Sequence, residues 1–501
     1  MQVQGLPPLR PIPSLPKRRA GVLLCMIALF AGAVAFAGEP VDPALEQAIS
    51  RIDAGGFAEA DRLIATRLLA NDLDASTRAD LLFQRERMRR IHLDFTLDAA
   101  QAKAALRKQI PDLTDTEFDA WDAAGLLERQ DIDGRRLYFK RAPSNLFRLS
   151  AQARARRANP APFLEGPMES ANDHHRQVRD AATGRGDPLA AMRRIRVTQS
   201  LTVDADAVPA GETVRAWIPY PRAIPGQQED LRLVSSQPAV HAVAPESALQ
   251  RTVYLEKPAR AGEPTAFSIT YEVTLRGQYH AIDADKVVAP PPTAELAPFL
   301  EARPPHVVFT PAIREFSRKV VGEEKNPYRI AQKLFAAVDR IPWAGAREYS
   351  TISNLGDYAL HAGHADCGQQ TLLLITLLRL NGIPARWQSG MVYSDGDYDN
   401  LHDWGALYLA PYGWVPMDVS TGRLEDPDPQ IAGFYLGGQD AYRIAFNDDY
   451  SREFVPAKQH FRSETVDLQR GEAEWKGGNL YFDQWDYGFA WERLPLDGGL
   501  R

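Results

Sequence analysis

Cysteine is scarce in this sequence, whose 501 residues contain only Cys25 and Cys367. Cys25 lies in an N-terminal apolar run that we expect to be removed after synthesis. The remaining thiol would then have no partner within the chain, which excludes a stabilising disulfide framework. Cys367 therefore needs another explanation, and a chemical role is the best one that the sequence offers.

Long hydrophobic runs are also lacking, since no segment beyond the first 37 residues approaches the roughly 18 apolar residues of a membrane-spanning helix. Residues 1–37 carry four basic residues and no acid, and an apolar run from Ala20 precedes Ala35-Phe36-Ala37. This pattern is typical of a signal peptide cleaved after Ala37. We expect a periplasmic or secreted protein without an integral membrane domain; an uncleaved signal anchor is the alternative.

Positive charge is in deficit, because 58 Lys and Arg stand against 65 Asp and Glu and give a net charge of −7. Cleavage after Ala37 removes four positive charges and brings the net charge to −11. An acidic protein of this kind is a poor partner for nucleic acid or for an anionic membrane surface.

Periodicity and composition divide the remaining chain into regions. Helical spacing, interrupted by a hairpin turn at Asp133-Gly134, gives way to a polar Pro- and Gly-rich stretch containing His174-His175, which we interpret as solvent-facing. Next come alternating strands and a proline-rich stretch. They are followed by a block of helices, then strands, and finally an aromatic tail. We therefore predict a helical N-terminal domain (38–157), a linker (158–190), a β-sandwich (191–285), a second linker (286–306), an α+β catalytic core (307–453) and a β-rich C-terminal extension (454–501).

Cys367 lies where a helix is expected to begin. A glycine-containing loop precedes it, and the strongly apolar run from Thr371 to Leu380 follows. A thiol at a helix N-terminus lies next to free backbone N–H groups and the positive end of the helix dipole, which favour its thiolate. Catalysis by such a thiolate also needs a base, and a group that orients the base.

His402 and Asp418 are the candidates for these two roles. His402 enters a predicted strand, and a return strand across Pro411-Tyr412-Gly413 ends at Asp418. A turn centred on Tyr412 pairs Asp418 with Ala406, on the same face as His402 but two side-chain positions away. A direct contact would then need a bulge, a longer loop or strong twist. Asp403 points to the opposite face and is a poor candidate for orienting His402.

Four blocks in this order resemble the core of the transglutaminase-like superfamily: Gly363-His364-Ala365-Asp366-Cys367-Gly368, Gly382-Ile383-Pro384-Ala385-Arg386, His402-Asp403-Trp404 and Gly413-Trp414-Val415-Pro416-Met417-Asp418. The resemblance covers roughly residues 325–425. It implies a papain-like α+β core with Cys367 as nucleophile, His402 as general base and acid, and Asp418 as orienting carboxylate. A second oxyanion donor beside the Cys367 N–H stays open among Tyr358, Trp343 and Gln369.

The resemblance implies acyl transfer from peptide or protein amides through a thioester, with hydrolysis slightly favoured over crosslinking to an amine. A protein-crosslinking transglutaminase is one alternative. A non-catalytic envelope scaffold is another, and its helical N-terminal domain would then bind a protein partner. A metal site at His361, His364, Asp366 and Cys367 fits no standard zinc spacing. We therefore expect no metal and no cofactor.

Overall fold

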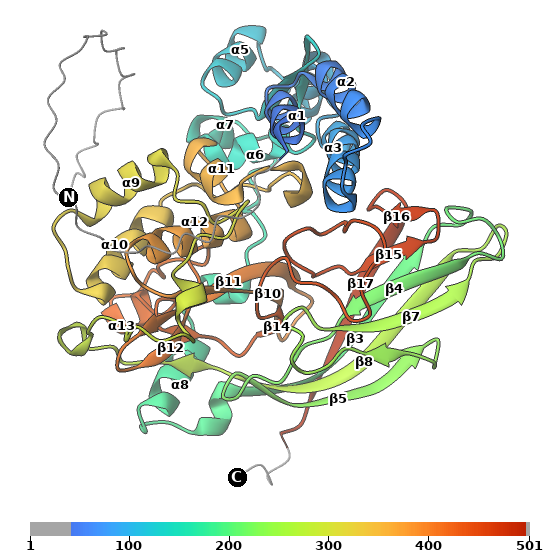
Figure 1. Cartoon of the computed structure of the whole chain (residues 1–501). Coiled ribbons are helices and arrows are strands. Elements are labelled where there is room, and N and C mark those ends of the chain that lie inside the picture. Colours follow the sequence, from blue (N-terminus) through green and yellow to red (C-terminus); the bar gives the residue numbers. More distant parts are fainter. Residues whose placement is uncertain (1–41, 497–501) are drawn as a thin grey trace, which may run out of the picture. The chain divides into compact units, whose positions relative to one another are not determined.

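The computed structural model describes residues 42–496, so the predicted signal peptide and Cys25 lie outside the described residues. Within residues 42–496, no helix has both the length and the apolar character needed to cross a membrane. The described chain is a mixed α+β structure in which helices come first and antiparallel sheets follow (Figure 1).

The N-terminal region is helical, as predicted, and its helices enclose an apolar core of their own. Thr114 caps one helix reciprocally with Glu117, an arrangement that satisfies two backbone N–H groups at the helix start. The predicted hairpin turns at Asp133 and Gly134, both with positive φ, as a two-residue turn between strands requires. The elements are α1 Pro43–Asp53, α2 Phe57–Leu68, α3 Ala75–Asp94, α4 Ala99–Arg107, α5 Asp115–Ala123, β1 Arg129–Ile132, β2 Arg135–Tyr138, α6 Ala142–Leu149 and α7 Ala151–Ala155.

The stretch for which we expected a linker, residues 158–190, contains helix α8, Asp173–Ala182. His174 and His175 are buried on this helix, so their interpretation as solvent-facing residues is wrong. His175 Nε2 lies 3.0 Å from Tyr435 Oη, and His174 Nε2 accepts a hydrogen bond from Ala441 N at 3.0 Å. Packing against the core therefore determines this short helix, whose own sequence is mostly polar.

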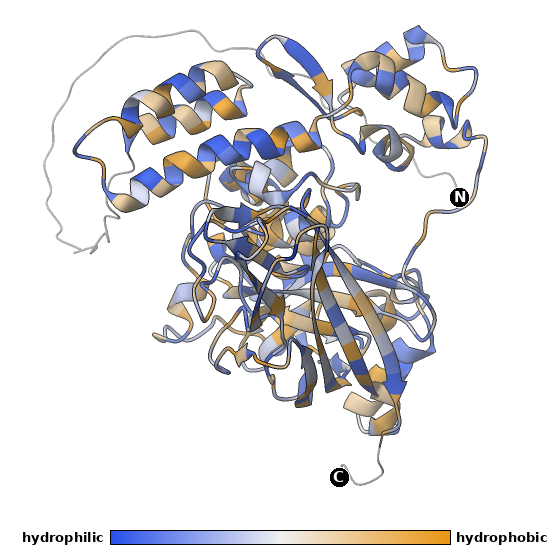
Figure 2. Ribbon diagram, turned by 90° about the vertical axis from the view of Figure 1, so that its right-hand side faces the viewer, coloured by the Kyte–Doolittle hydropathy of each residue, from blue (hydrophilic) through white to orange (hydrophobic). Residues whose placement is uncertain are grey.

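Two antiparallel sheets face each other across a shared apolar core and form a β-sandwich. In Figure 2 the long strands carry alternating hydrophilic and hydrophobic residues, the period expected when one face is buried. One sheet has the order β17-β3-β8-β5 and the other β16-β15-β4-β7-β6. Their strands are β3 Met192–Val203, β4 Thr213–Pro219, β5 Gln228–Gln237, β6 Ala242–Val243, β7 Thr252–Pro258, β8 Thr265–Arg276, β15 Glu472–Trp475, β16 Gly478–Leu480 and β17 Trp485–Leu494.

The aromatic tail is part of this sandwich, whereas the sequence indicated a separate extension. Strand β17 pairs with β3 over ten residues, and β15 pairs with β4, as the red and green arrows of Figure 1 show. Trp485 is buried, and Phe489 stacks on Phe446 with ring centroids 6.0 Å apart. Local pattern predicted the strands but could not reveal that their partners lie more than 200 residues earlier.

Residues 311–447 form helices that pack on one sheet with the strand order β12-β11-β10-β14. Helix α12 is the central helix, and every residue from Gly368 to Arg379 is buried. A helix that is apolar on all sides must be enclosed, and here α9, α10, α11 and the sheet surround it. The elements are α9 Pro311–Val321, α10 Pro327–Val338, α11 Leu355–His361, α12 Cys367–Leu380, β10 Ala385–Tyr393, β11 Asp399–Leu409, β12 Gly413–Met417, α13 Pro429–Ala432 and β14 Arg443–Asn447; the short strands β9 Gln278–Tyr279 and β13 Gly438–Gln439 pair with each other.

Candidate active site

Cys367 is the first residue of α12, the position predicted for it. The Asp366 side chain accepts a hydrogen bond from Gln369 N at 3.1 Å, and Gln369 Oε1 accepts one from Asp366 N at 3.1 Å. This reciprocal cap makes the helix begin at Cys367 and leaves the Cys367 side chain half-buried at the helix start. The loop beside it is held by Ala344 N, which donates to Ala365 O at 3.1 Å.

The thiol contacts Asp403, a residue that the sequence gave no reason to connect with it. Cys367 Sγ donates a hydrogen bond to Asp403 Oδ2 at 3.3 Å, and the hydrogen bonds found for this thiol within residues 42–496 do not include one to His402. Burial and the nearby Asp403 and Asp366 carboxylates raise the pKa of the Cys367 thiol well above its ordinary value. The protonated thiol is therefore the favoured form in this arrangement.

Asp403 is itself buried, with 2% of its surface exposed. Burial and the neighbouring Asp366 raise the pKa of Asp403 to about 7. Besides the thiol, Asp403 accepts hydrogen bonds from Tyr349 Oη at 3.2 Å and from Gln469 Nε2 at 3.0 Å. These donors favour the charged carboxylate, whereas the apolar surroundings oppose it.

Tyr349 connects the helix start to this carboxylate. Its hydroxyl lies 2.9 Å from Asp366 Oδ1, and it accepts a hydrogen bond from Gly368 N at 3.1 Å. A single hydroxyl proton can serve Asp366 or Asp403, but not both at once. Burial raises the pKa of Asp366 to about 6, so the two acids and the tyrosine compete for protons directly beside the thiol.

His402 and Asp418 are in direct contact, with 2.8 Å between His402 Nε2 and Asp418 Oδ2. The expected pairing of Asp418 with Ala406 is wrong, because Ala406 pairs with Pro416 and Gly405 with Met417. The turn is centred on Pro411, one residue earlier than we expected. Asp418 therefore follows directly after the last paired residue, one side-chain position from His402, and no bulge is needed for the contact.

Arg443 on β14 contacts the same oxygen of Asp418 as His402 does. Its Nη1 donates to Asp418 Oδ2 at 2.8 Å, and its Nη2 donates to Asp440 Oδ2 at 2.5 Å. Although burial opposes ionisation, the His402 and Arg443 charges hold the pKa of Asp418 far below its ordinary value. Burial also works against a charged His402, but Asp418 outweighs it and raises the pKa of the imidazole.

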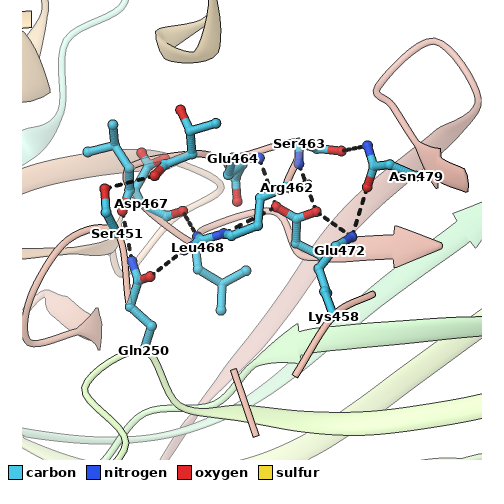
Figure 3. Close-up of polar contacts among 12 residues, drawn as sticks. Gln250, Ser451, Lys458, Arg462, Ser463, Glu464, Asp467, Leu468, Glu472 and Asn479 are labelled. Atoms are coloured by element: carbon cyan, nitrogen blue, oxygen red, sulfur yellow. Dashed lines mark hydrogen bonds and ion pairs between the residues drawn. The ribbon is translucent and has the colours of Figure 1, made fainter. Parts of the chain in front are cut away.

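The loop between β14 and β15 packs against His402 and Asp403, and buried charges hold this loop in place (Figure 3). Glu472 is fully buried and accepts hydrogen bonds from Lys458 Nζ at 3.0 Å and from Ser463 N at 2.9 Å. The same loop carries Gln469, whose Nε2 donates to His402 O at 2.9 Å as well as to Asp403. The tail therefore contacts both His402 and Asp403.

A cavity of about 680 Å³ opens at this point, and Cys367, His402 and Asp403 lie in its wall. Trp343 lines it too. Neither of the other oxyanion candidates lines the cavity: Tyr358 donates its hydroxyl proton to Glu128 at 2.7 Å, and Gln369 accepts a hydrogen bond in the helix cap through its Oε1. Of the three candidates for the second oxyanion donor, Trp343 is therefore the one that lines the cavity.

The residues of the alternative metal site diverge. The His361 ring lies 3.7 Å from Asp357 on an exposed surface, whereas His364 Nδ1 lies 3.1 Å from Ala362 O. Within residues 42–496, no three His, Cys, Asp or Glu side chains are grouped as metal ligands. The Cys367 thiol forms its hydrogen bond with Asp403 and is not grouped with His361 or His364.

Sequence reasoning missed three contributors to the site: Tyr349, Arg443 and the Asp403 side chain in its contact with the thiol. Asp403 is adjacent to His402, so alternation along the strand already placed it on the opposite face. That face is the one that α12 covers, which only the packed structure reveals. Tyr349 and Arg443 lie in segments without a motif, and nothing in their local sequence signals a role.

Comparison with known proteins supports the resemblance drawn from the motifs. Residues 314–419 match the family model of the transglutaminase-like superfamily. An uncharacterised protein of Haemophilus influenzae is 26% identical over 200 residues, which cover 32% of this chain and 52% of that protein. The chain therefore spans about half the length of this curated relative.

Two solved structures share parts of the arrangement at low similarity. A Cytophaga hutchinsonii protein, provisionally assigned as a cysteine protease, is 13% identical with a TM-score of 0.39, covering 61% of this chain and 92% of its own. The periplasmic domain of TgpA from Pseudomonas aeruginosa is 15% identical with a TM-score of 0.25, covering 48% of this chain and 91% of its own.

Proposed function

Since residues 314–419 form a transglutaminase-like core, we propose that this protein is a cysteine enzyme that transfers acyl groups from peptide or protein amides. Cys367 is the nucleophile, His402 the general base and acid, and Asp418 the carboxylate that orients His402. The observation that carries this proposal is the 2.8 Å contact between His402 and Asp418, in the same cavity as a thiol at a helix start.

The reaction follows from these positions. Sγ attacks the amide carbon while His402 takes the thiol proton, and the negative oxygen is stabilised by the Cys367 N–H at the start of α12. His402 then gives its proton to the leaving amine, and a thioester remains on Cys367. Water attacks the thioester, loses a proton to His402, and releases the carboxylic acid and the thiol. An amine acceptor in place of water would give a new amide.

The raised pKa of Cys367 influences how the thiolate forms. A protonated thiol beside Asp403 must first turn from this carboxylate towards His402, so proton transfer accompanies attack and no resting ion pair is required. Asp418 and Arg443 support this step because Asp418 stabilises the imidazolium that results, and Arg443 keeps Asp418 ionised.

The test is the rate at which iodoacetamide alkylates Cys367 as a function of pH, in the wild type, in His402→Ala and in Asp418→Asn. We expect His402→Ala to slow alkylation at neutral pH about tenfold or more, and Asp418→Asn to slow it less, because the ring remains but loses its charge partner. Equal rates in all three proteins would contradict the proposal.

We also propose that the protein acts outside the cytoplasm, as a periplasmic or secreted enzyme. The support is the signal-peptide pattern of residues 1–37. N-terminal sequencing of protein recovered from the periplasm or medium should begin at Gly38; a start at Met1 would show that the segment is retained. We favour water over an amine as acceptor because water is abundant in that compartment.

A further inference from the structure

One face of α6 lies along the loop that flanks Cys367, although this helix is far outside the matched core. Arg141 immediately precedes α6, and Asn145 and Arg148 follow at intervals of four and three residues. Side chains at this spacing lie on the same face of a helix. Asn145 joins α6 to this loop: its Nδ2 donates to Gly345 O at 2.8 Å, and its Oδ1 accepts a hydrogen bond from Gly345 N at 3.1 Å.

Arg141 and Arg148 stand on either side of this anchor, and both line the cavity that holds Cys367. A Cβ on Gly345 would lie 3.2 Å from Arg141 Nη1, so the Arg141 guanidinium passes directly over this glycine. Arg148 stacks on Trp343 and on Phe163, with its guanidinium carbon 4.4 and 4.2 Å from the two ring centroids. Both cations are therefore held in position by the neighbouring structure.

Acidic side chains lie near both guanidinium groups, but within residues 42–496 none of them is in direct contact with either one. Among the contacts of residues 42–496, neither the Arg141 nor the Arg148 side chain makes an ion pair or a hydrogen bond. Burial lowers the pKa of Arg148, while Glu169 and Glu165 raise it from a distance without forming an ion pair. Glu169 is already engaged with Gly166 N at 2.8 Å. A stacked guanidinium with free N–H donors is well suited to recognise a carboxylate in the plane of its fork.

Two contacts connect these charges to the segment that carries the thiol. Trp343, which carries Arg148 on its ring, forms a bridge with Ala365, two residues before Cys367. Asp366, whose pKa burial raises to about 6, lies near enough to Arg141 for this charge to lower it in part. Both cations therefore line the cavity in which a substrate amide would reach Cys367.

We propose that Arg141 and Arg148 form an anion-binding subsite, and that the substrate is a peptide with a free carboxylate near the amide that Cys367 attacks. This inference rests on the proposed function and names its substrate class. It also gives the helical N-terminal region a role, because α6 supplies specificity to a core that lacks these residues.

Two alkylating reagents of similar size and different charge test the subsite. Iodoacetate carries a carboxylate and iodoacetamide is neutral, so the ratio of their rates at Cys367 reports the electrostatic field at the thiol, with the iodoacetamide rate correcting for general effects on reactivity. At low ionic strength we expect the double variant Arg141→Gln/Arg148→Gln to lower this ratio about fivefold. Arg157→Gln is the matched control, since Arg157 also stacks on Phe163 but does not line the cavity. An unchanged ratio in the double variant would overturn the proposal.

A binding measurement separates this inference from the proposed function. Calorimetry on Cys367→Ala protein compares acetyl-Glu-Glu-amide with acetyl-Gln-Gln-amide, and needs no reactive thiol. We expect the acidic peptide to bind at least fivefold more tightly, and the difference to disappear in the Arg141→Gln/Arg148→Gln background. Equal binding of the two peptides would refute the subsite, whereas failure of iodoacetamide to label Cys367 would refute the proposed function alone.

Discussion

The contact between Cys367 and Asp403 determines the resting state of the site. An activated cysteine is ordinarily found beside positive charge, yet this thiol lies 3.3 Å from a carboxylate oxygen. The helix start favours the thiolate, but burial and two neighbouring acids outweigh it and raise the thiol pKa. The contact with Asp403 thus keeps the Cys367 thiol protonated, and protonation of Asp403 weakens this effect.

Asp403→Asn should accelerate alkylation of Cys367 by iodoacetamide at pH 7, about fivefold or more, because the substitution removes the negative charge that raises the thiol pKa. Asp399→Asn is a suitable control, since Asp399 lies on the same strand and in the same cavity but makes no contact with the thiol. Slower alkylation in Asp403→Asn would mean that Asp403 promotes thiolate formation.

Asp403→Asn should also raise the melting temperature of the protein, by an amount that depends on pH. Because burial raises the pKa of Asp403 to about 7, the stability contributed by its protonated form is complete below the ordinary carboxyl pKa of about 4, and is lost as pH rises through about 7. Asp403→Asn should therefore melt at a higher temperature than the wild type at pH 8, and the difference should shrink towards pH 4. A difference independent of pH would contradict the assignment.

At the level of elements, local patterns predicted the core well. The apolar run after Cys367, the cap at Asp366 and the stop at Asn381-Gly382 determine α12 within a few residues of sequence, so its start was predictable. The strand that contains His402 and the return strand that follows it were predictable for the same reason. These features depend on neighbours in the chain, which a single sequence displays directly.

Pairings between distant segments were not predictable. Strand β14 lies beside β10, although β11, β12 and α13 come between them in the chain. It delivers Arg443 to Asp418, a contact that no local pattern signals. The hairpin register was mispredicted by a one-residue shift of the turn centre, which changes which residue faces Asp418. Tertiary packing decides both outcomes.

Gly390 on β10 provides a test of the β10–β14 pairing. A Cβ at this position would lie 1.9 Å from Ile444 O, which belongs to the backbone and cannot turn away. Gly390→Ala should therefore lower the free energy of unfolding by about 2–4 kcal/mol, measured by urea titration. Gly396→Ala, in a loop where the nearest atom is 3.7 Å away, should change it by less than about 0.5 kcal/mol. Comparable effects of the two would contradict the close approach of the strands.

For the molecule as a whole, three segments far apart in sequence contribute to one cavity. The helical region supplies α6, the central region supplies Cys367 and His402, and the tail supplies Gln469. The buried cluster around Glu472 keeps the tail in place (Figure 3). The shape of this cavity therefore depends on contacts between the regions, and weakening these contacts should change it.

Arg90 on α3 makes one such contact between the helical region and the tail. Its fully buried guanidinium lies 4.2 Å from the Tyr481 ring centroid and donates to Arg462 O at 3.0 Å. Arg90→Ala should lower the free energy of unfolding by about 2–3 kcal/mol and increase hydrogen exchange in α3 and α6 more than in α12, because the lost contacts join regions and are not internal to the core. Arg85 lies on the same helix as Arg90 and forms an exposed ion pair with Asp61 of α2, so Arg85→Ala should leave exchange in α6 unchanged. A uniform increase across all helices in Arg90→Ala would show instead that the regions unfold as a single unit.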